Sequence, residues 1–300
     1  MKIDLFKVQR DALDQKISQF LPSPQAELLS GILLGRSRDL PGQLKLSLRD
    51  TSTLHIVVAS GQNLSMVAGF FLGLSGLIRR KNAVMLSLAA AIFYTLLSGL
   101  QVPILRAAIM FSFVSLAQLY GREREGTWVL IVTVGLMLLV NPRWITEISF
   151  QLSVLATFGV IVVAPIFLHW LDKIPIIGQD LAVSLAAQVM ITPVIAQNFH
   201  QFSLVGLLTN VLILWTVSFI MILGGAMLVA GFLWSSLAWL ISLAVSALLT
   251  YFIYIVQFFA SLPFAWEYVG EQWVVIWIGY YMVMGGVLLA LNKSGKISNF

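Results

Sequence analysis

The sequence predicts an all-α fold, a polytopic bundle of about nine transmembrane helices. The 300 residues are 59% hydrophobic and only 10% charged, whereas a soluble domain is about half apolar and a quarter charged. No Asp, Glu, Lys or Arg occurs between Asp180 and Glu267, a stretch long enough for several spans of about 20 residues each. The apolar runs are continuous and lack the alternation expected of a β-barrel.

Three parts are expected along the chain. Residues 1–50 form N-terminal amphipathic or interfacial helices, 51–292 the transmembrane domain, and 293–300 a short basic tail. The expected spans are 51–78, 82–97, 103–120, 126–140, 146–170, 181–198 and 272–291, with either two long or three short spans in 203–262.

The N-terminal part begins with apolar residues at helical spacing over 1–20. Two interpretations stay open: a helix lying on the membrane surface, and a helix packed on the rim of the protein itself. Pro24 suits the first turn of a second helix, 25–34. A polar link, 35–50, then leads into the first long apolar segment.

Basic residues in short loops set the orientation. If 203–262 makes two spans, the basic clusters share one side, which places the C-terminus in the cytoplasm and residues 1–50 outside. Residues 1–50 carry eight Lys and Arg, so this segment does not readily cross a membrane. Either the chain is part of a longer protein, or the first long segment doubles back. The basic residues are Arg79, Arg80, Lys81, Arg122, Arg124, Lys173, Lys293 and Lys296, and Glu267 and Glu271 lie opposite.

The first long segment, 51–78, contains His55 and the polar run Ser60, Gly61, Gln62 and Asn63. Lipid cannot satisfy such groups, so they face protein or a water-filled path. Gly61 lets the helix unwind there, and broken helices form transport sites. In the purely structural alternative, His55 and Asn63 hydrogen-bond neighbouring helices.

Arg106 lies one turn inside the span whose start Pro103 favours. An arginine at the centre of a span costs about 2.5–3.5 kcal/mol on insertion scales. Two interpretations stay open: a structural ion pair with Glu147, and contact with phosphate in a lumen.

Further polar side chains recur in later spans. Glu147 and Gln151, four residues apart, form one stripe. A second region begins at Gln188 and contains Gln197, with Asn210 in the next span. Pro193 frees a backbone carbonyl within the same helix as Gln197. Each residue alone is typical of helix packing, but their recurrence favours a hydrated interior.

The motifs expected of several enzyme classes are absent. The chain has no cysteine and three histidines, which excludes disulfides and thiolate metal sites. It has no His-Glu-x-x-His, Gly-x-Ser-x-Gly or Walker-type sequence. We therefore predict no catalytic residues, no metal site and no cofactor.

Four stretches together resemble the ComEC family: His55-Ile-Val-Val-Ala-Ser-Gly61, Pro103-Ile-Leu-Arg-Ala-Ala-Ile-Met110, Asn141-Pro142 followed by Ser149-Phe-Gln-Leu-Ser153, and Pro193 to Asn210. The resemblance covers about 25–290. It implies a channel in the bacterial inner membrane that passes single-stranded DNA into the cytoplasm during natural transformation. The chain departs at Gln62-Asn63, where many members have Leu-His.

The resemblance assigns roles and partners. His55 and Ser60 to Asn63 would line or gate the passage, Arg106 would meet phosphates, and Glu147, Gln151, Gln197 and Asn210 would hydrate it. The family's OB-like and nuclease-like domains are absent, which implies a separate nuclease. The other expected partners are membrane lipid, an external DNA receptor, a cytoplasmic motor and a second copy of the chain in a homo-oligomer. The alternatives are a small-solute or ion transporter with a site at the broken helix, and a membrane scaffold.

Overall fold

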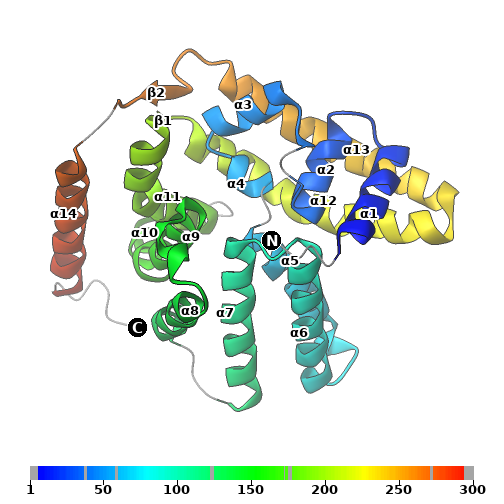
Figure 1. Ribbon diagram of the computed structural model, residues 1–300, viewed down its shortest axis with the longest axis horizontal. Helices are drawn as coiled ribbons and strands as arrows, with labels where there is room; N and C mark the ends of the chain where they lie inside the picture. The colour runs from blue at the N-terminus through cyan, green and yellow to red at the C-terminus, as the bar shows by residue number, and fades with distance from the viewer. Residues whose placement is uncertain are drawn as a thin grey trace. The chain divides into compact units, whose positions relative to one another are not determined.

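A computed structural model describes residues 6–36, 39–57, 60–121, 125–171, 173–174, 178–270 and 273–293. The chain divides into two compact units. Unit 1 comprises Met1–Arg124 with Leu212–Leu262, and unit 2 comprises Glu125–Val211 with Pro263–Phe300. Helices make up nearly all of the described chain (Figure 1), so the predicted all-α class is confirmed.

Three short helices open unit 1: α1 (Lys7–Phe20), α2 (Gln25–Leu34) and α3 (Gly42–Asp50). Every residue of α2 from Leu28 to Leu34 is buried, as expected for a helix that is apolar on all sides. α2 is therefore central to the unit's core, while α1 packs against it through the fully buried Ile17.

The prediction that 35–50 is a polar link was wrong for Gly42–Asp50, which form helix α3. Leu44 and Leu48 lie one helical turn apart and are both buried, and α3 packs on α13 (Ser235–Ala260). Two leucines at this spacing are too few to predict a helix in a mostly polar stretch of nine residues. They are enough to hold α3 in place once α13 offers an apolar surface.

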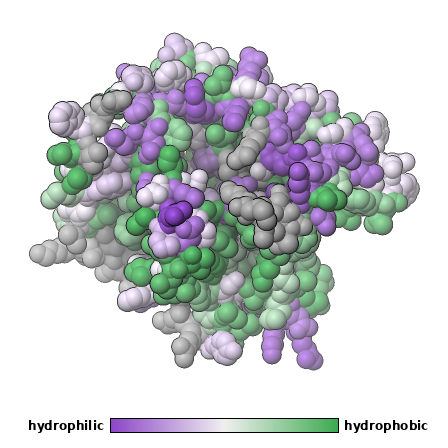
Figure 2. All heavy atoms as spheres, in the orientation of Figure 1, coloured by the Kyte–Doolittle hydropathy of each residue, from purple (hydrophilic) through white to green (hydrophobic). Residues whose placement is uncertain are grey.

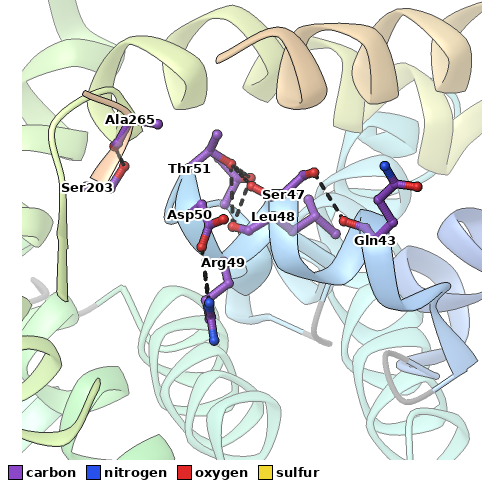
Figure 3. Close-up of polar contacts among 9 residues, drawn as sticks. Gln43, Ser47, Leu48, Arg49, Asp50, Thr51, Ser203 and Ala265 are labelled. Carbon is purple, nitrogen blue, oxygen red and sulfur yellow. Dashed lines mark hydrogen bonds and ion pairs between the residues drawn. The ribbon is translucent and has the colours of Figure 1, made fainter. Parts of the chain in front are cut away.

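The carboxyl end of α3 is closed by hydroxyl groups. The Thr51 hydroxyl donates to the Ser47 carbonyl at 2.8 Å and lies 2.8 Å from the Thr53 hydroxyl. Figure 3 shows Ser47 and Thr51 here, with the Arg49–Asp50 ion pair on the same helix. These bonds satisfy helix-end carbonyls inside the core, where an unpaired group would be costly.

An ionic cluster ties the end of α2 to α1. The Arg36 guanidinium lies 2.7 Å from the Asp39 carboxylate and 2.6 Å from the Asp11 carboxylate. The hydrogen bond with Asp39 makes the largest contribution to raising the pKa of Arg36 above its ordinary value. Because these groups are partly exposed, the cluster fixes the geometry of the α1–α2 pair more than it adds stability.

The remaining helices of unit 1 share one core with α2. α5, α6 and α7 pack together, and the chain turns at Trp234 between two long helices, so 203–262 makes two helices. The predicted interruption at Ser60 and Gly61 is confirmed, since no helix runs through Ser60. The elements are α4 (Leu54–Val57), α5 (Gly61–Gly73), η2 (Leu74–Gly76), α6 (Arg80–Leu97), α7 (Val102–Leu119), α12 (Gly206–Leu233, of which Leu212 onward belongs to this unit) and α13.

Unit 2 is built on α11 (Gly178–Phe199), which packs along a long helix containing one π-helical turn. A two-stranded antiparallel sheet pairs Ser203 with Trp266. The Ser203 hydroxyl also donates to the Ala265 carbonyl at 3.1 Å (Figure 3). The other elements are α8 (Gly126–Val140), η3 (Pro142–Thr146), α9 (Ile148–Phe158), the π turn η4 (Gly159–Val163), α10 (Ala164–Leu171), β1 (Gln201–Ser203), β2 (Trp266–Tyr268) and α14 (Val274–Lys293).

The small sheet was not predicted, because strands of three residues are too short to show alternation. The predicted basic tail lies outside the described residues except for Lys293, where α14 ends. Arg122, Arg124 and Glu271, used for the orientation, also lie outside them.

Five helices are long and apolar enough to cross a membrane. In unit 1, Figure 2 shows hydrophilic side chains over α1 to α3 and hydrophobic ones over α6 and α7. Large apolar side chains such as Phe93 and Trp239 are more than half exposed, as expected for surfaces that face lipid. The five helices are Val102–Leu119, Ile148–Leu171, Gly178–Phe199, Gly206–Leu233 and Ser235–Ala260.

A glycine pair tests the packing of unit 2. A Cβ at Gly159 would lie 2.5 Å from the Ala186 carbonyl oxygen, which is backbone and cannot move aside, whereas one at Gly135 would meet nothing within 4 Å. We expect Gly159→Ala to lower the free energy of unfolding by about 1–3 kcal/mol and Gly135→Ala to leave it unchanged or slightly raised. Thermal unfolding in detergent measures both, and equal effects would contradict the packing.

Candidate functional site

Ser60 begins helix α5. Its backbone is extended, with φ −110° and ψ 161°, and its Oγ accepts a hydrogen bond from the Asn63 N–H at 3.3 Å. The Ser60 hydroxyl in turn donates to Asn63 Oδ1 at 3.1 Å. This is an N-cap, which satisfies one of the free amides of the first turn. The polar run therefore has a local structural reason to break the helix where it does.

Asn63 connects this break to α2. The side chain is only 1% exposed, and its Nδ2 donates to the Ile32 carbonyl at 3.0 Å. The Tyr94 hydroxyl donates to the same carbonyl at 3.4 Å, and Gln101 Nε2 donates to the Gly35 carbonyl at 3.1 Å. Side chains from α5 and α6, and from the residue just before α7, thus satisfy carbonyls at the end of α2 that have no partner within the helix.

Arg106 lies against the amino end of α5. The residue is 8% exposed, and its Nη1 donates to Met110 Sδ at 3.2 Å. A Cβ built on Gly61 would be 3.6 Å from Arg106 Nη2 and 3.0 Å from Ala107 Cβ. The absence of a side chain at Gly61 therefore lets Ala107 of α7 pack closely on the helix start. The Arg106 guanidinium lies beside the same point, where amide dipoles carry partial positive charge.

His55 and Gln62 are both exposed. His55 Nδ1 lies 2.8 Å from the Ser52 carbonyl oxygen, and since a carbonyl only accepts, Nδ1 carries the proton. His55 belongs to α4, which ends at Val57, whereas Gln62 belongs to α5, so the two side chains do not share the face of one helix. Ala59 lies outside the described residues.

Glu147 and Gln151 lie at the start of α9 in unit 2. Glu147 is exposed and occupies the N-cap position without a side-chain cap. Gln151 Nε2 donates to the Ile145 carbonyl in η3 at 2.9 Å. Arg106 belongs to unit 1, so its ion pair with Glu147 stays a prediction, as do the roles of both residues in a passage.

Gln197 and Asn210 are half-buried in unit 2. Gln197 Oε1 accepts from the Trp277 indole N–H at 2.9 Å, and Asn210 Nδ2 donates to Ser184 Oγ at 2.8 Å. Asn210 Oδ1 is buried without a hydrogen-bond partner in the described part of the chain. Ser184 and Gln197 lie about 20 Å apart along α11 at 1.5 Å per residue, so the two sites are separate.

Four polar side chains were missed from sequence: Tyr94 in unit 1, and Trp277, Tyr280 and Tyr281 in unit 2. Their signal was present, because a hydroxyl or indole N–H in an apolar helix needs a partner. Their partners are backbone carbonyls or a distant amide, which sequence does not identify. Within the described ranges, no group of three His, Cys, Asp or Glu side chains is placed to hold a metal ion.

Membrane-length apolar helices joined by partly buried polar contacts, such as Asn210 with Ser184 and Tyr251 with the Leu212 carbonyl, define a multi-pass membrane protein. The Competence protein family matches residues 32–294, and the chain belongs to that family. The resemblance found in the sequence is thereby confirmed.

Several curated proteins are similar to the chain. ComE operon protein 3 of Bacillus subtilis is 28% identical over 223 residues, covering 74% of this chain and 28% of that protein. Uncharacterized protein YcaI of Escherichia coli is 27% identical over 219 residues, covering 66% of this chain and 28% of that protein. An uncharacterized Aquifex aeolicus protein is 30% identical over 157 residues, 51% of this chain and 37% of that protein. The chain thus spans under two fifths of these relatives, and no solved structure matches it.

Adjacent residues test the bond from Asn63 to α2. Asn63→Leu removes the 3.0 Å bond to the buried Ile32 carbonyl, so we expect the free energy of unfolding to fall by about 1–3 kcal/mol. Gln62→Leu changes an exposed neighbour, so we expect a change within about 0.5 kcal/mol. Thermal unfolding in detergent measures both, and an unchanged Asn63→Leu protein would refute a stabilising role for this bond.

Proposed function

We propose that the chain is the channel core that passes single-stranded DNA into the cytoplasm during natural transformation. Family membership supports a role in competence and DNA uptake. The carrying observation is the buried Arg106 guanidinium beside the amino end of α5. The positive charge of the guanidinium and the partial positive charge of the helix amino end, close together, attract a phosphate.

Contact between a moving strand and Arg106 requires reversible binding. The guanidinium can hold two phosphate oxygens at once. Gly61 lets α7 pack closely against the α5 start, so the Arg106 guanidinium and the first amides of α5 are neighbours. Ser60, Gly61 and Asn63 then shape the passage, and the exposed His55 and Gln62 lie where they would line or gate it.

The remaining predicted residues supply hydration in this proposal. Glu147 is exposed, and Gln151, Gln197 and Asn210 keep polar atoms at partly exposed positions. Amides and carboxylates beside the strand replace water that lipid cannot provide. Exposed aromatic side chains offer further surfaces for stacking bases.

We also propose a nine-span topology in the bacterial inner membrane. The two helices in 203–262 favour it, because two spans there place the basic clusters on one side. α5, with 13 residues, reaches about 20 Å, short of a hydrocarbon core of about 30 Å. α4 and α5 together then make the broken first crossing.

We propose that partners of the chain supply other steps of DNA uptake. A separate nuclease, an external DNA receptor and a cytoplasmic motor would act with the channel core in the membrane lipid. We also propose that the chain associates with further copies of itself.

Arg106 provides the direct test. In a deletion strain without a paralogue, we expect wild type to restore transformation and Arg106→Met to reduce it about tenfold or more, since a hydrogen bond to a charged group is worth about 1.5–3 kcal/mol. Arg143→Met removes an exposed arginine and serves as the control. Transformation frequency at matched protein levels is the measurement.

Two outcomes would contradict the proposal. Undiminished DNA uptake in the deletion strain would refute a DNA channel. Full activity of Arg106→Met would refute the phosphate contact. Small-solute flux through purified protein in vesicles, without DNA uptake, would instead support a transporter with its site at the broken helix.

A further inference from the structure

Helix α14 is attached to α11 through three aromatic side chains. The Trp277 indole donates to Gln197 Oε1 at 2.9 Å, the Tyr280 hydroxyl to the Val189 carbonyl at 3.0 Å, and the Tyr281 hydroxyl to the Met190 carbonyl at 2.8 Å. Both helices belong to unit 2. Polar bonds to α11 are therefore a principal attachment of α14.

Pro193 explains why one acceptor is available. In an α-helix the N–H of residue 193 would donate to the carbonyl of residue 189. Proline has no N–H, so the Val189 carbonyl lacks its helical partner while Pro193 itself is buried. Tyr280 supplies the missing donor from another helix. The Met190 carbonyl, bonded by Tyr281, loses no partner to Pro193.

Trp277 determines how the Gln197 amide is oriented. An indole N–H can only donate, so it must face the oxygen of the amide. The amide nitrogen of Gln197, a donor, is thereby turned away from Trp277. Because Gln197 is half-buried at the polar end of α11, it offers N–H groups suited to phosphate oxygens.

Apolar packing holds the rest of α14 only in part. Tyr281, Met284 and Leu288 pack on a small cluster containing Val163 and Met190, whereas on the opposite side Met282 is 72% and Val283 69% exposed. Loss of one hydrogen bond should therefore change how α14 sits on α11.

We infer that Trp277 and Tyr280 are positioning residues for the polar groups of α11. Tyr280 occupies the acceptor that Pro193 creates, and Trp277 turns the Gln197 amide so that it presents its donor. The role of Gln197 toward phosphate rests on the proposed function, whereas the pairing of Tyr280 with Pro193 does not.

The pairing is tested by thiol labelling, because the chain has no cysteine. Met284→Cys, half-buried on the α11 side, reports the seating of α14 through its rate of reaction with a maleimide. We expect Tyr280→Phe to raise that rate about threefold, the change typical of one side-chain hydrogen bond in a membrane protein. In a Pro193→Ala background, which restores the N–H, Tyr280→Phe should have a smaller effect, because the Val189 carbonyl then has a helical partner as well.

Tyr281→Phe is the matched control. It removes the same hydroxyl one residue away, but its acceptor is independent of Pro193, so its effect should persist in Pro193→Ala. Met282→Cys, on the exposed side, should label at one rate in every background. Equal effects of Tyr280→Phe with and without Pro193 would overturn the pairing.

The orientation of Gln197 is tested by transformation frequency at matched protein levels. We expect Trp277→Phe to reduce it, and to add nothing once Gln197→Leu is present. Trp273→Phe, at a position 80% exposed, should leave it unchanged. A further loss in the Gln197→Leu background would overturn the positioning role. Undiminished uptake in the deletion strain would overturn the proposed function without affecting the labelling result.

Discussion

Backbone carbonyls that helices leave without a partner constrain this structure most strongly, because lipid cannot supply a hydrogen bond to them. Each unit meets the problem with side chains from other helices. At the end of α2, Asn63 and Tyr94 donate to the Ile32 carbonyl. Within α11, Tyr280 donates to the Val189 carbonyl that Pro193 leaves free. These bonds join helices far apart in sequence.

The need to satisfy backbone groups gives the broken first segment two structural roles. Ser60 stops one helix and starts the next, and this places Asn63 in contact with α2, the most buried helix of unit 1. The same start brings Gly61 beside Arg106. The helix cap and the buried guanidinium therefore occupy one place, and under the proposed function a change there affects stability and transport together.

Much of the fold followed from hydropathy, since α2 and α8 have the predicted bounds 25–34 and 126–140. α3 and the two-stranded sheet did not follow from hydropathy. Their few apolar residues predict a helix or a strand only when the surface that covers them is known. For the site, the sequence singled out the positions of Ser60, Asn63 and Arg106 by the cost of polar groups in apolar segments. Their roles in a passage stay predictions.

The sequence by itself determined a multi-pass helical membrane protein and the break at Ser60, because burial in lipid restricts backbone and charge so severely. The family resemblance came from four short motifs along the chain. Tertiary structure decided which atoms meet. Only the fold pairs Asn63 with Ile32, Trp277 with Gln197 and Tyr280 with Val189. A side chain's need for a partner is encoded locally, but the partner is a backbone group that looks the same at every position in the sequence.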